Sequence, residues 1–326
     1  MKSLQNEKVL AFKSFIEAYD SFLIAGHKEP DGDCVASSLG ISYILDFFGK
    51  EYILLNAGPF KRSEISIYSD KFTSRIPFMS EYDRQRTGLI ITDCSELHRL
   101  GELDGDLSGL DTFIIDHHKT SEEGENSIID SSAPAAACIV HQLFSALCGK
   151  PSKEQAETLF FGISTDTGFF RFLTENSADV FRGVSELVEC GANPKETYRR
   201  MTGGKPWSTR KLLGILLSKA ELYANGKLAL TFETMDDSKL YGQEGRDSDA
   251  LYSALLSAEG VEAAAFIRQD TETTCTIGLR SNTTCDVSVI AAKFGGGGHK
   301  NASGAATDGR LETIKQLLIK EFSKVL

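Results

Sequence analysis

The residues of this chain that are best suited to chemistry are aspartates and histidines gathered in short groups. The first group is His27-Lys-Glu-Pro-Asp31-Gly-Asp33, where Pro30 and Gly32 favour a tight turn that can direct both carboxylates into one cavity. Imidazole and carboxylate ligands of this kind suit divalent ions such as Mn²⁺. Taken alone, the group fits a surface turn better, with its carboxylates making only local hydrogen bonds.

A second group, Asp116-His117-His118, shifts the balance toward a metal site. It follows an apolar run, and buried imidazoles and carboxylates are costly unless they are paired or ligated. Three of the six histidines in the chain fall in this group and at His27. Asp93 and Asp166 stand alone, and a lone aspartate more often caps a helix or turn. The metal-site interpretation therefore depends on the whole set.

Short apolar runs deliver several of these residues. The runs are Phe22–Ala25, Tyr52–Leu55, Leu89–Thr92 and Thr112–Ile115, each separated from the next by enough residues for a helix or crossover. Continuous apolar strands of this kind predict a mostly parallel sheet flanked by helices, and hence an α/β fold. Because His27, Asp93 and Asp116 each follow a strand, we expect them at the carboxyl edge of the sheet, where ligands bind.

The length of 326 residues favours two domains. The polar stretch Met201-Thr-Gly-Gly-Lys-Pro206 resembles a junction. We therefore predict a larger N-terminal domain over residues 1–200 and a smaller α/β domain over 207–326. In the second domain we expect helices at 208–223, 250–259, 287–294 and 311–322, and strands at 228–232, 263–268 and 274–279.

A glycine run in the second half is the other feature that could bind a ligand. Gly295-Gly-Gly-Gly298 is followed by His299 and Lys300, then by Ser303. Without side chains, backbone N–H groups can approach a phosphate closely. Arg280 and Ser281 end a predicted strand nearby, and a guanidinium suits bidentate phosphate contact. A bare glycine run more often forms a flexible loop, but the residues that follow this one favour phosphate binding.

Charge and composition limit the partners. The formal net charge is −11, and the isoelectric point lies near 5.1. Proteins that hold long nucleic acids normally carry a basic stripe, so we expect no long double-stranded nucleic acid as partner. We find no signal peptide and no transmembrane run, and expect a cytoplasmic protein without a membrane partner. Seven cysteines without a Cys-x-x-Cys pair argue against a disulfide framework or a thiolate zinc site.

The order of these groups resembles the four motifs of the DHH phosphoesterase family. The glycine run resembles the motif of the DHH-associated C-terminal domain, and the length resembles the subgroup of nanoRNases and 3′-phosphoadenosine-5′-phosphate (pAp) phosphatases. The resemblance implies two Mn²⁺ ions, with Mg²⁺ or Co²⁺ as alternatives. One ion would be held by His27, Asp31 and Asp93, and the other by a set that shares Asp93, namely Asp33, Asp93, His117 and Asp166.

The same resemblance assigns the remaining residues. His118 would face the scissile phosphate, and Asp116 would support the ligands around it. The substrate phosphates would be held by Arg280, Ser281, Gly297, Gly298 and His299, with Arg171 as a further anion contact. One departure is Cys94, which stands where a small hydroxyl residue is more usual.

We expect, on this basis, a Mn²⁺-dependent enzyme that hydrolyses very short oligoribonucleotides to nucleoside 5′-monophosphates, dephosphorylates pAp to AMP, or does both. A linear or cyclic dinucleotide phosphodiesterase is the first alternative. An inorganic pyrophosphatase is disfavoured, because its second domain would carry a Ser-Arg-Lys-Lys-Gln motif that Ser208-Thr-Arg-Lys211 only faintly matches. A single-strand DNA exonuclease would be longer and would carry an additional nucleic-acid-binding domain. A non-catalytic nucleotide-binding regulator is disfavoured because all the proposed metal ligands are present. The sequence leaves a homodimer open.

Overall fold

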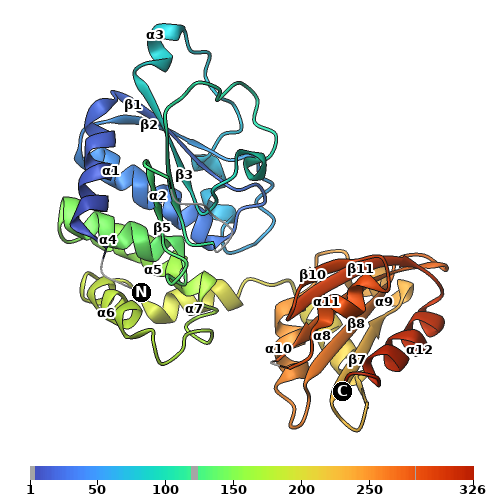
Figure 1. The fold of residues 1–326 in the computed structure, drawn as a ribbon. Helices are drawn as coiled ribbons and strands as arrows, with labels where there is room; N and C mark the ends of the chain where they lie inside the picture. Colours follow the sequence, from blue (N-terminus) through green and yellow to red (C-terminus); the bar gives the residue numbers. More distant parts are fainter. Residues whose placement is uncertain (1–3, 119–123, 283) are drawn as a thin grey trace. The chain divides into compact units, whose positions relative to one another are not determined.

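The chain forms two compact units in the computed structural model, Met1–Gly204 and Lys205–Leu326 (Figure 1). The structure describes residues 4–118, 124–282 and 284–326. Within these residues, no helix is both long and apolar enough to span a bilayer.

A five-stranded parallel sheet lies at the centre of the N-terminal unit. Its strands are β1 (Ser21–Gly26), β2 (Glu51–Leu55), β3 (Thr87–Thr92), β4 (Thr112–Asp116) and β5 (Ser127–Ile129), in the order β2-β1-β3-β4-β5. The four apolar runs identified in the sequence are all strands of this sheet. The predicted α/β class, with a larger domain built on a parallel sheet, is confirmed.

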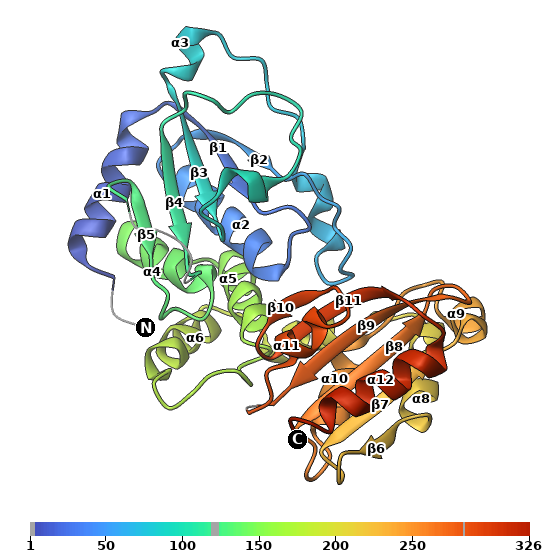
Figure 2. The same ribbon diagram turned by 45° about the vertical axis from the view of Figure 1, so that its right-hand side comes forward.

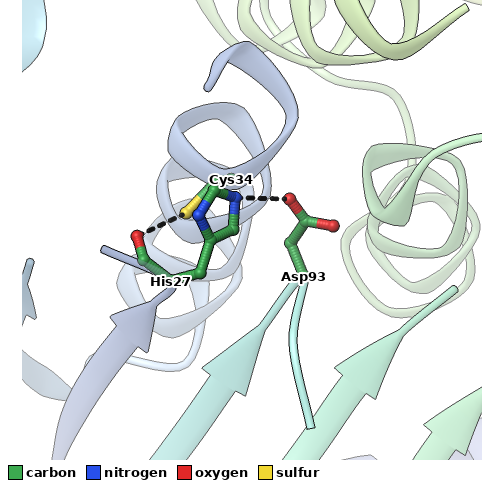
Figure 3. Close-up of side chains that lie close together, drawn as sticks. All are labelled: His27, Cys34 and Asp93. Atoms are coloured by element: carbon green, nitrogen blue, oxygen red, sulfur yellow. Dashed lines mark hydrogen bonds and ion pairs between the residues drawn. The ribbon is translucent and has the colours of Figure 1, made fainter. Parts of the chain in front are cut away.

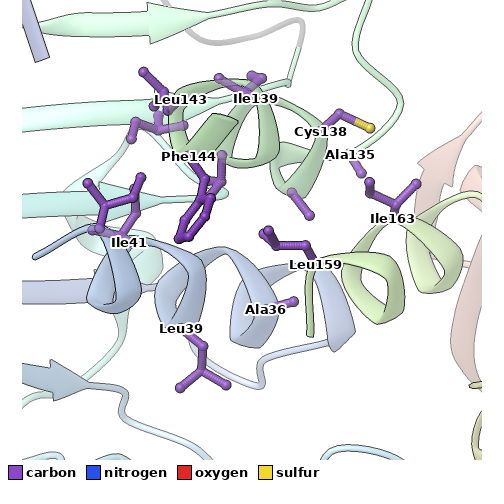
Figure 4. Close-up of a cluster of buried hydrophobic side chains, with 14 of the residues drawn as sticks. Ala36, Leu39, Ile41, Ala135, Cys138, Ile139, Leu143, Phe144, Leu159 and Ile163 are labelled. Atoms are coloured by element: carbon purple, nitrogen blue, oxygen red, sulfur yellow. The ribbon is translucent and has the colours of Figure 1, made fainter. Parts of the chain in front are cut away.

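Helices cover one face of this sheet. They include α1 (Asn6–Ala18), α2 (Gly32–Phe47), α4 (Ala136–Cys148) and α5 (Lys153–Asp166). Figure 4 shows side chains of α2, α4 and α5 meeting in the largest of the described apolar cores, among them Ile41, Phe144 and Leu159. A second core on the opposite face joins Leu23 and Leu89 to apolar residues of the connecting segments. Those segments include the 3₁₀ turns η1 (Ser66–Lys71) and η2 (Leu97–Leu100) and the short α3 (Glu81–Arg84).

The helix α2 is buried on nearly every side, because small residues let its neighbours approach closely. An added Cβ at Gly162 of α5 would lie 2.6 Å from Ala36 Cβ and 2.8 Å from Ala137 Cβ. An added Cβ at Gly40 of α2 would lie 2.6 Å from Val140 Cγ1. These two glycines therefore set how closely α2, α4 and α5 pack. The helices α6 (Ala178–Glu189) and α7 (Pro194–Thr202) complete the unit.

The C-terminal unit is a six-stranded sheet with helices, described here by itself. Its strands are β6 (Glu221–Tyr223), β7 (Leu228–Glu233), β8 (Ala263–Gln269), β9 (Thr274–Ser281), β10 (Gly297–His299) and β11 (Ala302–Asp308), in the order β10-β11-β9-β8-β7-β6. Only β7 and β8 pair in parallel. Helices α8 (Trp207–Ser218), α9 (Met235–Tyr241), α10 (Ser248–Leu256), α11 (Val287–Ala292) and α12 (Leu311–Phe322) accompany them (Figure 2).

One local prediction for this unit was wrong, and several elements were not predicted. The expected helix at 208–223 ends at Ser218, and β6 follows it. The glycine run is not a free loop, because Gly297–His299 forms β10 and pairs with β11. The short helix α9 and the strand β11 were not predicted at all. Neither shows a strong apolar period. The helix α9 buries none of its residues and begins at a capping box formed by Thr234 and Asp237, whereas β11 is held by pairing with β9 and β10.

The crowding around Gly162 leads to a stability prediction. Gly162→Ala should lower the stability of the N-terminal unit by about 1–3 kcal/mol, the usual cost of overpacking a core. Gly214→Ala is the control, because Gly214 lies inside α8 with no heavy atom within 4 Å of an added Cβ. Since Ala favours helix over Gly, the control should stabilise by about 0.5–1 kcal/mol. Denaturant unfolding of both variants measures these changes, and equal shifts would refute the packing account.

Candidate metal centre

The predicted ligands converge at the carboxyl edge of the parallel sheet. The strands β1 and β3 are neighbours in the sheet, although β2 lies between them in the sequence. From β1, the chain adds β2 on one side and β3, β4 and β5 on the other, so the strand order reverses direction between β1 and β3. Ligands of open α/β sheets bind outside such a switch point. His27 follows β1, Asp93 follows β3, and Asp116 ends β4. The sheet order therefore brings residues from three strands to one place.

Asp93 lies between two histidines. Its Oδ2 is 3.4 Å from His27 Nε2, and its Oδ1 is 3.3 Å from His117 Nε2 (Figure 3 shows the His27 side). Asp93 has a φ of 59°, an uncommon conformation for a residue with a side chain. Its Oδ1 is buried, and no described residue donates a hydrogen bond to it. An unsatisfied buried carboxylate oxygen between imidazoles is what a missing cation would leave.

Both histidines are oriented by main-chain carbonyls. His27 Nδ1 lies 2.8 Å from Lys28 O, and His117 Nδ1 lies 3.2 Å from Ala133 O. A carbonyl can only accept a hydrogen bond, so each Nδ1 donates and each Nε2 keeps its lone pair when the ring is neutral. Metal-ligating histidines are held in this way.

Asp33 is fully buried and anchored by the start of α4. Its Oδ2 accepts from Ala136 N at 2.6 Å, and its Oδ1 accepts from Ala137 N at 2.8 Å and Ser37 Oγ at 3.2 Å. The amides of a helix N-terminus stabilise a carboxylate through their hydrogen bonds and dipoles. Asp31 instead begins α2, where its Oδ1 accepts from the backbone N–H groups of Asp33 and Cys34.

Asp166, the last of the predicted ligands, is the final residue of α5. Its Oδ2 lies 3.5 Å from His117 Nε2, and Asp33 Oδ2 lies 3.8 Å from the same nitrogen. One ligand atom each from Asp33, His117 and Asp166 therefore fall within 4.8 Å of one another. All six predicted metal ligands, namely His27, Asp31, Asp33, Asp93, His117 and Asp166, lie in one cluster.

The electrostatics of the cluster reflect crowded negative charge. Burial and the neighbouring carboxylates of Asp93 and Asp166 raise the pKa of Asp33 well above its usual range. Burial also raises the pKa of Asp166 to about 6 despite the nearby His117. For Asp31, burial is the largest single influence and raises the pKa, but the interactions with His27, the backbone N–H of Cys34 and the charge of Arg62 together outweigh it and lower the value to about 2. The carboxylates compete for too few positive partners, which a divalent cation would supply.

These donors fit divalent metal ions. The cluster offers carboxylate oxygens and imidazole nitrogens, the ligand types of Mn²⁺ and related ions. Cys34 also lies near His27 and Asp93 (Figure 3). Burial raises the pKa of its thiol to about 11, and its Sγ lies 3.8 Å from His27 O, where it can donate a hydrogen bond. Cys34 is therefore a neutral buried thiol beside the site, and an added Cβ at Gly26 would lie 2.3 Å from its sulfur.

His118 and Asp116 form a separate pair at the edge of the cluster. Asp116 is fully buried, and its Oδ1 accepts from His118 Nδ1 at 2.7 Å and from the backbone N–H groups of His117 and His118. The imidazole of His118 is about one-third exposed. Asp116 thus fixes the His118 ring with Nδ1 as the donor, and Nε2 remains for a substrate group.

In the C-terminal unit, Arg280 and His299 lie in one row across the sheet. Ala302 of β11 pairs with Arg280 on one side and with His299 on the other. Residues directly opposite one another point to the same face of a sheet, so the two side chains share a face. Arg280 Cζ also lies 4.8 Å from the centroid of the Tyr252 ring. A guanidinium and an exposed imidazole on one face can hold a phosphate.

Three glycines, Gly296 just before β10 and Gly297 and Gly298 within it, differ in what they require. At Gly296, an added Cβ would lie 2.0 Å from Gly304 O. At Gly298, it would lie 2.6 Å from Ala302 O, whereas at Gly297 it would meet no heavy atom within 4 Å. Close packing of the hairpin thus explains two of these glycines. Ser281 is buried, and its hydroxyl donates to Cys285 O at 2.7 Å. Its side chain supports the end of β9.

Arg171 lies in the N-terminal unit, close after Asp166 in the chain. Its Nε donates to Gly168 O at 2.9 Å, and its side chain is exposed. Sequence patterns gave no signal for Ser37, for the carbonyl of Ala133 or for the α4 amides as partners of the ligands. Any residue can supply a main-chain group, so side-chain types cannot reveal these contacts.

A parallel sheet whose carboxyl edge carries these aspartates and histidines defines a phosphoesterase built for divalent metal ions. A model of the N-terminal domain of the DHH family matches residues 21–163, and a model of the DHHA1 domain matches residues 238–324. The "Bifunctional oligoribonuclease and PAP phosphatase NrnA" of Thermus thermophilus is 32% identical over 88% of this chain and 84% of its own length. The chain belongs to the DHH family.

Two further comparisons bear on the fold and the subgroup. The "Cyclic-di-AMP phosphodiesterase PdeA" of Listeria monocytogenes is 27% identical over 97% of this chain, which spans 48% of that protein. A crystal structure of an "exopolyphosphatase-related protein" from Bacteroides fragilis superposes with a TM-score of 0.84 at 25% identity and covers 99% of this chain and 98% of its own. The two-unit architecture is thus shared over the whole length of a solved structure.

The unsatisfied oxygen of Asp93 predicts a metal-dependent change in stability. Mn²⁺ at about a hundred times its dissociation constant should stabilise the wild-type protein by about 2.7 kcal/mol, because it binds only the folded site. Asp93→Asn should lose most of this gain, since the amide keeps the shape but removes the charge. Unfolding after EDTA treatment, with and without added Mn²⁺, measures the effect.

The control is Asp70→Asn, which alters an exposed aspartate of η1 outside the cluster. It should keep the full gain from Mn²⁺. If Mn²⁺ stabilised Asp93→Asn as much as the wild-type protein, Asp93 would not be a central ligand.

Proposed function

We propose that this protein is a Mn²⁺-dependent phosphoesterase that cleaves very short oligoribonucleotides to nucleoside 5′-monophosphates and removes the 3′-phosphate of pAp. The main support is the cluster around Asp93, where one carboxylate faces His27 with one oxygen and His117 with the other. The Thermus relative and relatives from Streptococcus mutans and Bacillus subtilis are named for these two activities, oligoribonuclease and pAp phosphatase. A cytoplasmic location and a homodimer stay predictions.

The proposal assigns the metal ligands in two sets that share Asp93. His27, Asp31 and Asp93 would hold one Mn²⁺, and Asp33, Asp93, His117 and Asp166 would hold the second. Bound there, the two ions would lower the pKa of an attacking water and offset negative charge on the phosphate. Residues 1–200 would thus be the catalytic domain, and residues 207–326 the substrate-binding domain.

The protein's own groups prepare this chemistry. Asp116 accepts from Nδ1 of His118 and leaves Nε2 for the substrate: it accepts a hydrogen bond when the ring is neutral, and it donates a hydrogen bond or a proton to a phosphate oxygen when the ring carries both protons. The α4 amides hold Asp33 in place and leave it little freedom to turn away. We propose that Arg280, His299 and the backbone of Gly297 and Gly298 contact other substrate phosphates, with Arg171 as an additional cation. Of the two glycines, Gly297 has open space beside it, and Gly298 is packed against β11. Ser281 fixes the end of β9.

A dinucleotide phosphodiesterase is the second candidate. The similarity to the Listeria protein supports it, and a cyclic dinucleotide presents the same phosphodiester as a linear one. The difference lies in what the substrate-binding domain accepts. Faster hydrolysis of substrates with a free phosphate end would favour the first proposal. Faster hydrolysis of cyclic dinucleotides would favour the second.

A substrate panel with Mn²⁺ tests the proposed function. The panel contains pAp, ribonucleotides of two to five units, linear and cyclic di-adenylate, pyrophosphate and a 30-nucleotide single-stranded DNA. We expect the dinucleotide and pAp to be turned over at least about tenfold faster, as kcat/KM, than the DNA, because a few phosphate contacts cannot hold a long strand on an acidic protein. Rapid hydrolysis of pyrophosphate with inert dinucleotides would contradict the proposal.

The division of labour between the domains makes a separate prediction. His299→Ala should raise KM for pAp or a dinucleotide by about tenfold, because it removes one charge-assisted or hydrogen-bonded phosphate contact. Its Mn²⁺ content should equal that of the wild type, since the ligands lie in the other unit. His98→Ala is the control, as His98 is an exposed histidine on η2. Loss of metal from His299→Ala would refute the assignment.

A further inference from the structure

The segment after Asp166 has an unusual backbone. Gly168, Phe169 and Phe170 have φ values of 56°, 55° and 70°, so three successive residues adopt the left-handed conformation. For a bulky residue this conformation is an outlier and is energetically unfavourable. Such strain persists only where the surroundings impose it, and it is concentrated at functional sites.

Hydrogen bonds from the end of α5 impose this conformation. Phe169 N donates to Ser164 O at 2.7 Å, and Phe170 N donates to Thr167 Oγ1 at 3.1 Å. The chain then folds back, and Phe172 N donates to Thr167 O at 3.2 Å. Thr167 directly follows the ligand Asp166. The turn therefore holds the backbone of Phe172 next to Thr167, one residue from Asp166 of the metal centre.

Two of the three phenylalanines in this segment are packed, and one is not. The rings of Phe169 and Phe170 lie 6.5 and 5.8 Å from that of Phe160 in the core of the unit. Phe172 is 68% exposed, and within the described part of the chain it makes no ring–ring contact. Packing thus explains the first two side chains and leaves the third without a structural reason.

The exposed ring has a defined orientation. It lies against Gly168, where an added Cβ would be 2.5 Å from Phe172 Cε2. The guanidinium carbon of Arg171 lies 5.5 Å from the ring centroid. An aromatic ring beside a guanidinium is a surface on which nucleobases stack.

We propose that Phe172, flanked by Arg171, is a stacking site for a nucleobase of the substrate. This inference rests on the proposed function, because it takes the reacting phosphate to lie at the metal centre. A base that reaches Phe172 then belongs to a nucleotide at that phosphate. Every base has a π-face, so the site accepts purines and pyrimidines and selects nucleotides over esters that lack a base.

The charge of the protein makes such a contact useful. With a formal net charge of −11, the chain as a whole does not attract an anionic substrate electrostatically. Stacking is largely independent of charge and contributes affinity where electrostatic attraction is weak. The other partly exposed aromatics nearby do not compete for this role, because Phe181 and Tyr198 lie 5.8 and 5.0 Å from the rings of Phe170 and Phe169.

Fluorescence tests the contact without turnover. Trp207 is the single tryptophan of the chain, so Trp207→Phe gives a silent background in which Phe172→Trp introduces one indole. With Mn²⁺ present, AMP should quench this indole saturably, and ribose 5-phosphate, which lacks a base, should not. The matched control places the indole at Phe78, which is 97% exposed elsewhere in the N-terminal unit, by Phe78→Trp. No quenching by AMP at position 172, or equal quenching by both ligands or at both positions, would overturn the inference.

Kinetics give a second, independent readout. Phe172→Leu keeps apolar bulk and removes the ring, whereas Phe172→Trp in the native background keeps a ring. We expect Phe172→Leu to raise KM for a ribodinucleotide about tenfold, and Phe172→Trp to restore a value close to that of the wild type. Equal values for the two variants would refute stacking. A wild-type protein that hydrolyses no nucleotide with Mn²⁺ would refute the proposed function instead, while the fluorescence comparison would still decide the base contact.

Discussion

The structure of the N-terminal unit depends on one electrostatic constraint, the burial of several carboxylates at one edge of a sheet. Like charges in a desolvated site repel, and each must find a hydrogen-bond donor, a cation or a proton. Asp33 finds the amides of α4, Asp31 finds those of α2, and Asp116 finds His118. Asp93 has too few hydrogen-bond donors, because its Oδ1 accepts no hydrogen bond from the described residues. The site is therefore complete only with cations.

The packing of the helices follows from the same constraint. The amides of Ala136 and Ala137 reach Asp33 only if α4 begins directly against α2. That approach requires small residues where the helices meet, which explains why Gly40 and Gly162 have no room for a side chain. An apolar core with larger residues at these positions would hold the helices apart. Stability and metal binding are thus linked through the same two glycines.

How much of this could be predicted from the sequence depends on the range of each interaction. The strands were predictable because a buried parallel strand is a continuous apolar run. The convergence of His27, Asp93 and Asp116 was predictable because each lies at the end of such a run. The α4 amides were not, since more than a hundred residues separate Asp33 from Ala136. The hairpin of β10 and β11 was also missed, because glycines carry no hydrophobic pattern. The left-handed conformation of Phe169 and Phe170 contradicts local preference and arises only from contacts with α5.

The two kinds of substrate contact differ in how they respond to metal. A phosphate approaching Asp31, Asp33, Asp93 and Asp166 meets negative charge until cations reverse the local field, so phosphate affinity in the N-terminal unit should follow metal loading. The proposed contacts from Arg280 and His299, and the proposed stacking on Phe172, would need no bound ion. An acidic protein that combined both could recognise a nucleotide before its metal site is filled and hydrolyse it only afterwards. The requirement for metal would then fall on the chemical step rather than on recognition.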